Sequence, residues 1–231
     1  MSELEKISKS FGKISIFTKD ECNEVSESVK NLSDQWVPRG PDLGVEHFFF
    51  TLGATSYLDC RESRDQYARQ VAVSNRALSS SLSWMYKKIE KGLTPLLGDC
   101  KISSELGAPG FHIFSRLGMK GTPEIESIGS IEPPAHYDIQ HLYHRDYFES
   151  FSSFDFDRTL SFTIPVSLPE NNCGLKVYDP SLEVVFNEPE DYLSETSPGI
   201  FLIDYSLGDA FYHFGKIKHQ MSVNRSNLTP G

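Results

Sequence analysis

The hydrophobic and polar positions of this chain follow two different periods, and the change between them comes near Gly110. Between residues 67 and 89, apolar side chains recur at steps of three, four and seven residues, the spacing of a helix with one buried face. These positions are Tyr67, Val71, Leu78, Leu82, Met85 and Ile89. The stripe predicts a long helix that packs against a sheet.

Shorter elements are predicted before this helix. The alternation over Lys13–Thr18 is typical of a strand. Thr18 and Glu21 then form a capping-box pattern, which predicts a helix that continues to about Leu32. The aromatic run Glu46–Thr51 indicates another strand.

After Gly110 the chain consists of short β-rich runs separated by turns that contain Gly, Pro, Asn and Asp, which favours a sandwich or barrel. The predicted strands are Phe111–Ser115, Ile125–Ile131, His136–Gln140, Arg158–Val166, Gly174–Tyr178, Leu182–Phe186, Gly199–Tyr205, Ala210–Phe214 and His219–Val223. We therefore expect a mostly β protein with supporting N-terminal helices. It would be one domain over residues 1–231, with a support region over about 1–104 and a β core over about 105–231.

Composition and charge narrow the classes of partner. The net charge is −10, from 32 acidic and 22 basic residues. This balance, with no basic stripe in the sequence, argues against a nucleic-acid backbone as the main partner. Four scattered cysteines without a C-x-x-C pair predict free thiols rather than a disulfide frame or a zinc knuckle. The first residues lack an apolar signal core, and no run reaches membrane-spanning length, so we expect a cytoplasmic protein with no membrane partner.

The candidate chemistry is a His-x-Asp pattern at His136 and Asp138, followed 81 positions after the aspartate by His219. Residues i and i+2 of a strand point to the same side, so His136 and Asp138 can bind one ion while Tyr137 faces away. Two imidazoles and one carboxylate are the set that holds a non-haem Fe(II) and leaves its other positions open. A third ligand must come from a strand that is distant in sequence, and His219 follows a turn–strand–turn segment suited to deliver it.

The order of these segments resembles the Fe(II)- and 2-oxoglutarate-dependent oxygenases over roughly residues 105–231. Pro134–Asp138 is similar to the family's first metal strand, and Arg158–Leu168 with Cys173–Tyr178 is similar to its central pair of strands. The segment from Leu207 to His219 resembles the one that carries the distal histidine. The resemblance implies a double-stranded β-helix, also called a jelly roll.

The resemblance also implies a function. Fe(II) would be held by His136, Asp138 and His219, with 2-oxoglutarate and O2 as co-substrates and succinate and CO2 as products. Related halogenases have a small residue at the position of Asp138, so a carboxylate there favours hydroxylation, desaturation or cyclisation. We expect hydroxylation of a C–H bond in a small molecule, first a free amino acid or related metabolite. The alternatives are a protein-bound or carrier-bound residue as substrate, or a cupin-like module that binds a metal or ligand without turnover.

Three assignments stay open at this stage. The family's basic residue for the far carboxylate of 2-oxoglutarate is either Arg225 or a residue after Gly231, because Arg225 follows His219 by only six positions. His213 is an alternative to His219 as the distal ligand. The aromatic segment Tyr143–Phe156 is either a lid over the site or a plug on the barrel. Other histidines are expected outside the metal set: His141 and His144 in a loop beside the pocket, and His47 and His112 as core residues.

Overall fold

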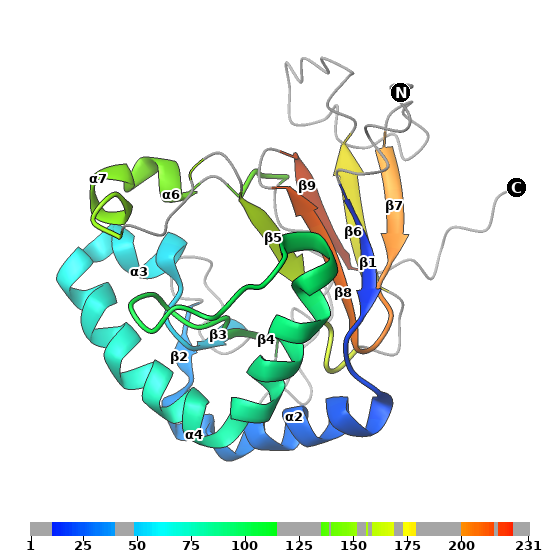
Figure 1. The fold of residues 1–231 in the computed structure, drawn as a ribbon, viewed down its shortest axis with the longest axis horizontal. Helices are drawn as coiled ribbons and strands as arrows, with labels where there is room; N and C mark the ends of the chain where they lie inside the picture. Colours follow the sequence, from blue (N-terminus) through cyan, green and yellow to red (C-terminus); the bar gives the residue numbers. More distant parts are fainter. Residues whose placement is uncertain are drawn as a thin grey trace, which may run out of the picture.

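The computed structural model describes residues 11–39, 49–114, 135–138, 140–151, 156, 159–168, 173–178, 200–214 and 217–223. Within these ranges the protein is mixed α/β, with three small antiparallel sheets and several helices (Figure 1). The helices lie mostly in the N-terminal part and the strands mostly in the C-terminal part, which agrees with the helix-then-strand order that the sequence predicts. Two predicted strands, Ile125–Ile131 and Leu182–Phe186, lie outside the described residues.

The N-terminal strand and helix confirm the local pattern. Strand β1 spans Phe11–Ser15, and helix α2 spans Lys19–Asn31. The capping box is present, because Glu21 N donates to the hydroxyl of Thr18 at 3.3 Å and Thr18 N donates to the Glu21 carboxylate at 2.7 Å. These two bonds fix the residue at which the chain leaves the strand and starts the helix.

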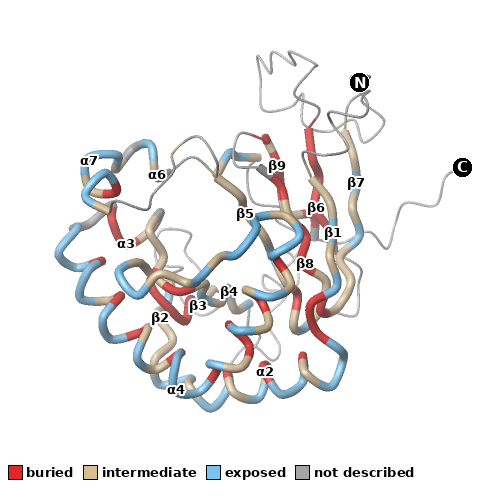
Figure 2. Tube along the Cα trace, viewed as in Figure 1, coloured by how far each residue is buried: buried red, intermediate tan, exposed pale blue. Residues whose placement is uncertain are grey.

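The long helix α4, Arg64–Leu97, has the predicted buried stripe. Its inner face is buried and its outer face is exposed along most of its length (Figure 2). Leu82 has non-helical backbone angles, φ −129° and ψ 21°, so α4 consists of two helical pieces joined at a kink. The kink lets one continuous apolar stripe follow the curved surface of the core.

Each of the three sheets has three strands. The strand orders are β1-β8-β5, β2-β3-β4 and β7-β6-β9, and all pairs are antiparallel. The strands after β1 are β2 Val37–Pro38, β3 Phe49–Leu52, β4 Phe111–Phe114, β5 Leu160–Thr163, β6 Cys173–Tyr178, β7 Ile200–Asp204, β8 Asp209–Phe214 and β9 His219–Val223. The remaining short helices are η1 Ser33–Gln35, α3 Ser56–Glu62, α6 Gln140–Tyr143 and α7 Arg145–Phe148.

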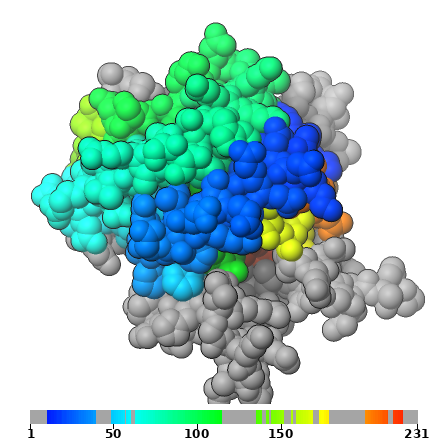
Figure 3. Space-filling model, turned by 90° about the horizontal axis from the view of Figure 1, so that it is seen from below, coloured from blue at the N-terminus to red at the C-terminus, as the bar shows by residue number. Residues whose placement is uncertain are grey.

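The main hydrophobic core joins the helices to the first two sheets. Side chains from α2 and α4 pack with residues of β3, β4 and β8, and the cluster includes Val25, Leu52, Leu78 and Ala210. Seen from below, α2 and α4 form a large part of the surface (Figure 3). The predicted packing of the amphipathic helix against a sheet is therefore confirmed.

The turn before β8 depends on a glycine. Gly208 has φ +80°, and a Cβ there would lie 2.2 Å from the carbonyl oxygen of Phe17. The Gly208 carbonyl also accepts backbone hydrogen bonds from Ile16 and Phe17 at 3.0 and 2.9 Å. This turn therefore fixes β8 beside β1, and β8 is the strand that carries His213.

One local prediction near residue 140 was wrong. The run His136–Gln140 is not a regular strand, because only His136 forms an isolated bridge and Gln140 begins α6. Within the aromatic segment Tyr143–Phe156, residues Arg145–Phe148 form α7. In α7, Phe148 is buried and its ring centroid lies 5.3 Å from that of Tyr147.

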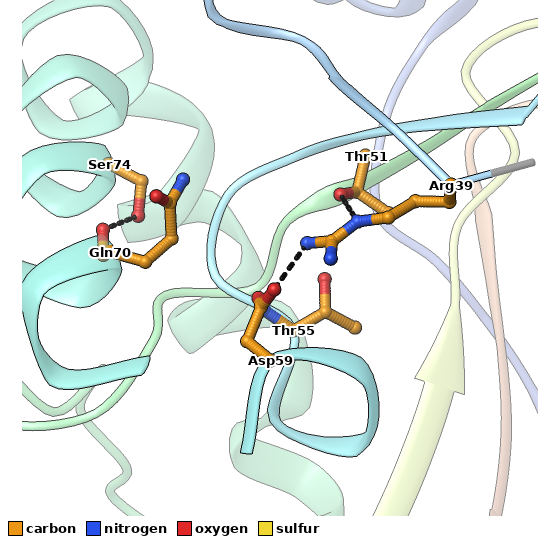
Figure 4. A network of polar contacts seen from close by, with 6 residues as sticks. All are labelled: Arg39, Thr51, Thr55, Asp59, Gln70 and Ser74. Atoms are coloured by element: carbon orange, nitrogen blue, oxygen red, sulfur yellow. Dashed lines mark hydrogen bonds and ion pairs between the residues drawn. The ribbon is translucent and has the colours of Figure 1, made fainter. Parts of the chain in front are cut away.

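A buried ion pair joins β3, α3 and the residue after β2 (Figure 4). Arg39 Nη2 lies 2.6 Å from Asp59 Oδ1, and Arg39 Nε donates to the Thr51 hydroxyl at 2.8 Å. The other Asp59 oxygen accepts the backbone N–H of Thr55 at the start of α3, at 2.7 Å. One carboxylate thus holds both the guanidinium and the helix start.

Two sequence expectations concern the chain as a whole. All four cysteines are free, as predicted: Cys22, Cys60, Cys100 and Cys173. Among the described residues, no helix has the length and apolar character needed to cross a membrane.

Candidate metal centre

His136 and His219 are direct backbone partners. His136 N donates to His219 O, and His219 N donates to His136 O, both at 2.9 Å. In an antiparallel pair, residues directly opposite each other place their side chains on the same face, and the two imidazole centroids lie 4.4 Å apart. The pairing therefore brings together two histidines that are 83 positions apart in the sequence.

Asp138 completes the group. One ligand-type atom from each of His136, Asp138 and His219 lies within 4.8 Å of the others. Nε2 of His136 is 3.7 Å from Asp138 Oδ1, and Nε2 of His219 is 3.6 Å from Asp138 Oδ2. Tyr137, between the first two, is an exposed side chain, as the alternation predicts. The structure thus brings together the three predicted ligands.

The environment of His219 suits it to bind a metal. Its Nδ1 lies 3.0 Å from the carbonyl oxygen of Ile217, and since a carbonyl only accepts, this nitrogen carries the hydrogen. The lone pair is then on Nε2, which faces Asp138. Burial lowers the pKa of His219 to about 4, and the neighbouring His213 adds to the effect. A neutral imidazole with a fixed tautomer is the form that metal binding requires.

The carboxylate of Asp138 is held in its charged form. Burial acts to raise its pKa, but His219, a hydrogen bond from Ser161 and two further histidines outweigh this, so the pKa lies below its usual value. The two histidines are His213 and His136. A charged carboxylate among imidazoles at neutral pH is the donor set expected for a divalent first-row metal. The residues present therefore fit such an ion.

His213 lies beside the centre but outside the compact group. Its Nε2 is 3.6 Å from Asp138 Oδ2, and its ring centroid is 4.0 Å from that of His219. Its ligand-type atoms do not belong to the set that lies mutually within 4.8 Å among the described residues. The geometry therefore favours His219 over His213 as the third ligand.

Arg225 and the other histidines named from the sequence were expected around the centre or in the core. Arg225 and His47 lie outside the described residues. His141 lies in α6, and His144 directly precedes α7, so both belong to short helical turns rather than to a loop. His112 was expected in the core but is exposed on β4, where its ring meets the edge of Phe49 at 5.5 Å. The alternation of β4 turns Phe111 and Ile113 toward the core and His112 to the other face.

Ser161 was not among the predicted site residues. This residue gives Asp138 a side-chain hydrogen bond from β5. In the sequence, Ser161 and Thr163 are the two polar residues that alternate with Leu160 and Phe162 in β5, so the alternation does not single out Ser161.

Acid should destabilise the metal-free protein through His219. Its pKa is about 4 when folded and near 6.5 in an unfolded chain, so between these values the unfolded state binds the additional proton. Between pH 7 and pH 4.5 this should remove about 2–3 kcal/mol of stability, an effect that is absent above pH 7. Urea unfolding in the presence of a chelator at several pH values measures it. His219→Gln should show a correspondingly flatter dependence, and equal slopes for both proteins would contradict the assignment.

No protein-family model matches this sequence, and a search of curated proteins finds no match either. The functional assignment therefore rests on the residues and their geometry.

Proposed function

We propose that this protein is an Fe(II)- and 2-oxoglutarate-dependent dioxygenase that hydroxylates a C–H bond of a small molecule. The observation that carries the proposal is the compact group of His136, Asp138 and His219, whose ligand-type atoms lie within 4.8 Å of one another. Two imidazoles and one carboxylate on one side of an ion are the set used by non-haem Fe(II) oxygenases that leave positions open for co-substrates.

The strand order supports a jelly-roll core. In an eight-stranded jelly roll, one sheet contains the second, seventh, fourth and fifth strands in that order, and the third pairs with the sixth in the other sheet. If the His136 segment counts as the second strand, β5 to β9 are the third to the seventh. The pairings His136–β9, β9–β6, β6–β7 and β5–β8 then follow the jelly-roll order.

The two sheets face each other at the proposed metal. His213 on β8 and His219 on β9 belong to different sheets, yet their rings are 4.0 Å apart. This arrangement suits a centre enclosed by two layers of strands.

Each residue has a defined task in the proposed reaction. Fe(II) with bound 2-oxoglutarate and O2 would supply the oxidising power for hydroxylation of the substrate and release of succinate and CO2. His136 and His219 would each bind the ion through an imidazole nitrogen, and the Ile217 carbonyl orients His219. Asp138 supplies the negative charge and occupies a position that would otherwise admit an external anion. This occupancy favours hydroxylation over halogenation. Arg225 remains the candidate for the far carboxylate of 2-oxoglutarate.

The substrate that we propose is a small molecule, first a free amino acid or related metabolite. A net charge of −10 disfavours polyanionic substrates such as nucleic acids.

Anaerobic addition of Fe(II) and 2-oxoglutarate tests the proposal directly. A chelate of the two in the protein should give a visible charge-transfer band, and admitting O2 with a suitable amino acid should yield succinate. His136→Ala should give neither signal, because one of the two imidazole ligands is missing. A protein that binds Fe(II) tightly but never develops the band would contradict the oxygenase assignment.

A second candidate function is a cupin-like module that binds a metal or ligand without turnover. The contact of His213 with Asp138 favours it, since a third imidazole on the ion would close one of the positions needed by the co-substrates. Succinate release after O2 is admitted distinguishes the two functions, because four protein groups on a six-coordinate ion leave two positions, enough for the chelate but not for the chelate and O2 together.

A further inference from the structure

We propose that His213 and Ser161 form a positioning pair that keeps the carboxylate of Asp138 bound to the metal through one oxygen only. This inference rests on the proposed function, because it concerns the same metal centre. It assigns a role to two residues that do not themselves belong to the ligand group.

The first observation is the register of the sheet. Ser161 on β5 and His213 on β8 are directly opposite each other in an antiparallel pair, so their side chains share one face. Ser161 gives Asp138 a side-chain hydrogen bond, and Nε2 of His213 lies 3.6 Å from Asp138 Oδ2. The carboxylate therefore lies between this pair on one sheet and His219 on the other.

The second observation is the chemistry of these contacts. A carboxylate only accepts hydrogen bonds, so the Ser161 hydroxyl is the donor, and Nε2–H of His213 is a second donor aimed at the same group. The 3.6 Å separation exceeds a hydrogen bond by roughly 0.5 Å, which a small rotation of the carboxylate would close. The pair would then hold Oδ2, which also lies 3.6 Å from Nε2 of His219, and leave Oδ1, 3.7 Å from Nε2 of His136, as the oxygen that binds the ion.

The consequence concerns the number of open positions on the ion. A carboxylate bound through one oxygen occupies one of six positions, and with two imidazoles it leaves three. A carboxylate bound through both oxygens leaves two, which is too few for a keto-acid chelate together with O2. Outer hydrogen bonds to a ligand commonly change metal affinity by about 10–100-fold, so the pair should affect both affinity and coordination.

The test uses Mn(II) and the full chain, without 2-oxoglutarate. Affinity is measured by electron paramagnetic resonance of free Mn(II), and the waters on the bound ion by proton relaxation. For Ser161→Ala and for His213→Phe we expect about 10–100-fold weaker binding. We also expect lower relaxation per bound ion, because the released carboxylate oxygen displaces a water. Tyr212→Phe is the matched control, since Tyr212 neighbours His213 on β8 but faces the opposite side of the sheet.

Each outcome decides the inference. Unchanged affinity and relaxation in folded Ser161→Ala and His213→Phe would overturn the pair while leaving the proposed function intact. A loss in His213→Phe as complete as in Asp138→Ala would make His213 a ligand and would also overturn it. If His213→Phe does not fold, Ser161→Ala, which removes only one oxygen, decides alone. If the unaltered protein binds no Mn(II), the proposed function fails and the inference fails with it.

Discussion

Replacing Asp138 by alanine is expected to weaken Fe(II) binding by far more than about 100-fold, the upper end of what residues outside the ligand shell contribute. The carboxylate is the only anionic member of the group, and without it two neutral imidazoles remain. His136→Ala should have a comparable effect. Anaerobic titration of the metal, with Mn(II) as a redox-stable substitute, measures both losses.

The controls separate ligand loss from loss of fold. His144→Ala removes an imidazole that precedes α7 and lies outside the compact group, so its metal affinity should equal that of the unaltered protein. Circular dichroism should show that Asp138→Ala and His136→Ala keep the unaltered secondary structure. Tight metal binding that survives both substitutions would place the metal elsewhere in the protein.

The long-range geometry of this centre is only partly encoded in local sequence. The i, i+2 relation of His136 and Asp138 can be predicted because it depends on one extended segment. The approach of His219 depends on a backbone pairing across 83 positions, and the sequence indicated it only through the turn–strand–turn segment before His219 and the resemblance to a family. Ser161 could not be found at all, since nothing in one strand shows which strand of the other sheet it will face.

The predicted elements differ in accuracy for a physical reason. The capping box at Thr18 and the stripe on α4 follow from contacts within a few residues, and both are confirmed. His136–Gln140 was predicted as a strand because its composition fits one. Its extended part ends early, because α6 starts at Gln140. The composition of a segment indicates that it can be extended, but it does not show where tertiary contacts end the strand.

Replacing Asp59 by alanine is expected to lower the free energy of unfolding by about 3–5 kcal/mol, the usual result of removing one partner of a buried ion pair. Arg39 cannot lose its charge, and its side chain is only 12% exposed, so the guanidinium would remain buried and charged. The backbone N–H of Thr55 at the start of α3 would also lose its acceptor. Urea unfolding monitored by circular dichroism at pH 7 measures the loss.

An exposed pair of the same chemistry provides the control. Arg145 and Glu149 also approach to 2.6 Å, but their side chains are 60% and 52% exposed, so Glu149→Ala should cost less than about 1 kcal/mol. Leucine at both Arg39 and Asp59 should recover much of the stability lost in Asp59→Ala, because it removes the uncompensated charge together with its partner. A similar cost for Asp59→Ala and Glu149→Ala would mean that water reaches Arg39. Burial, rather than the ion pair itself, therefore determines how strongly this contact ties α3 to the sheet beside it.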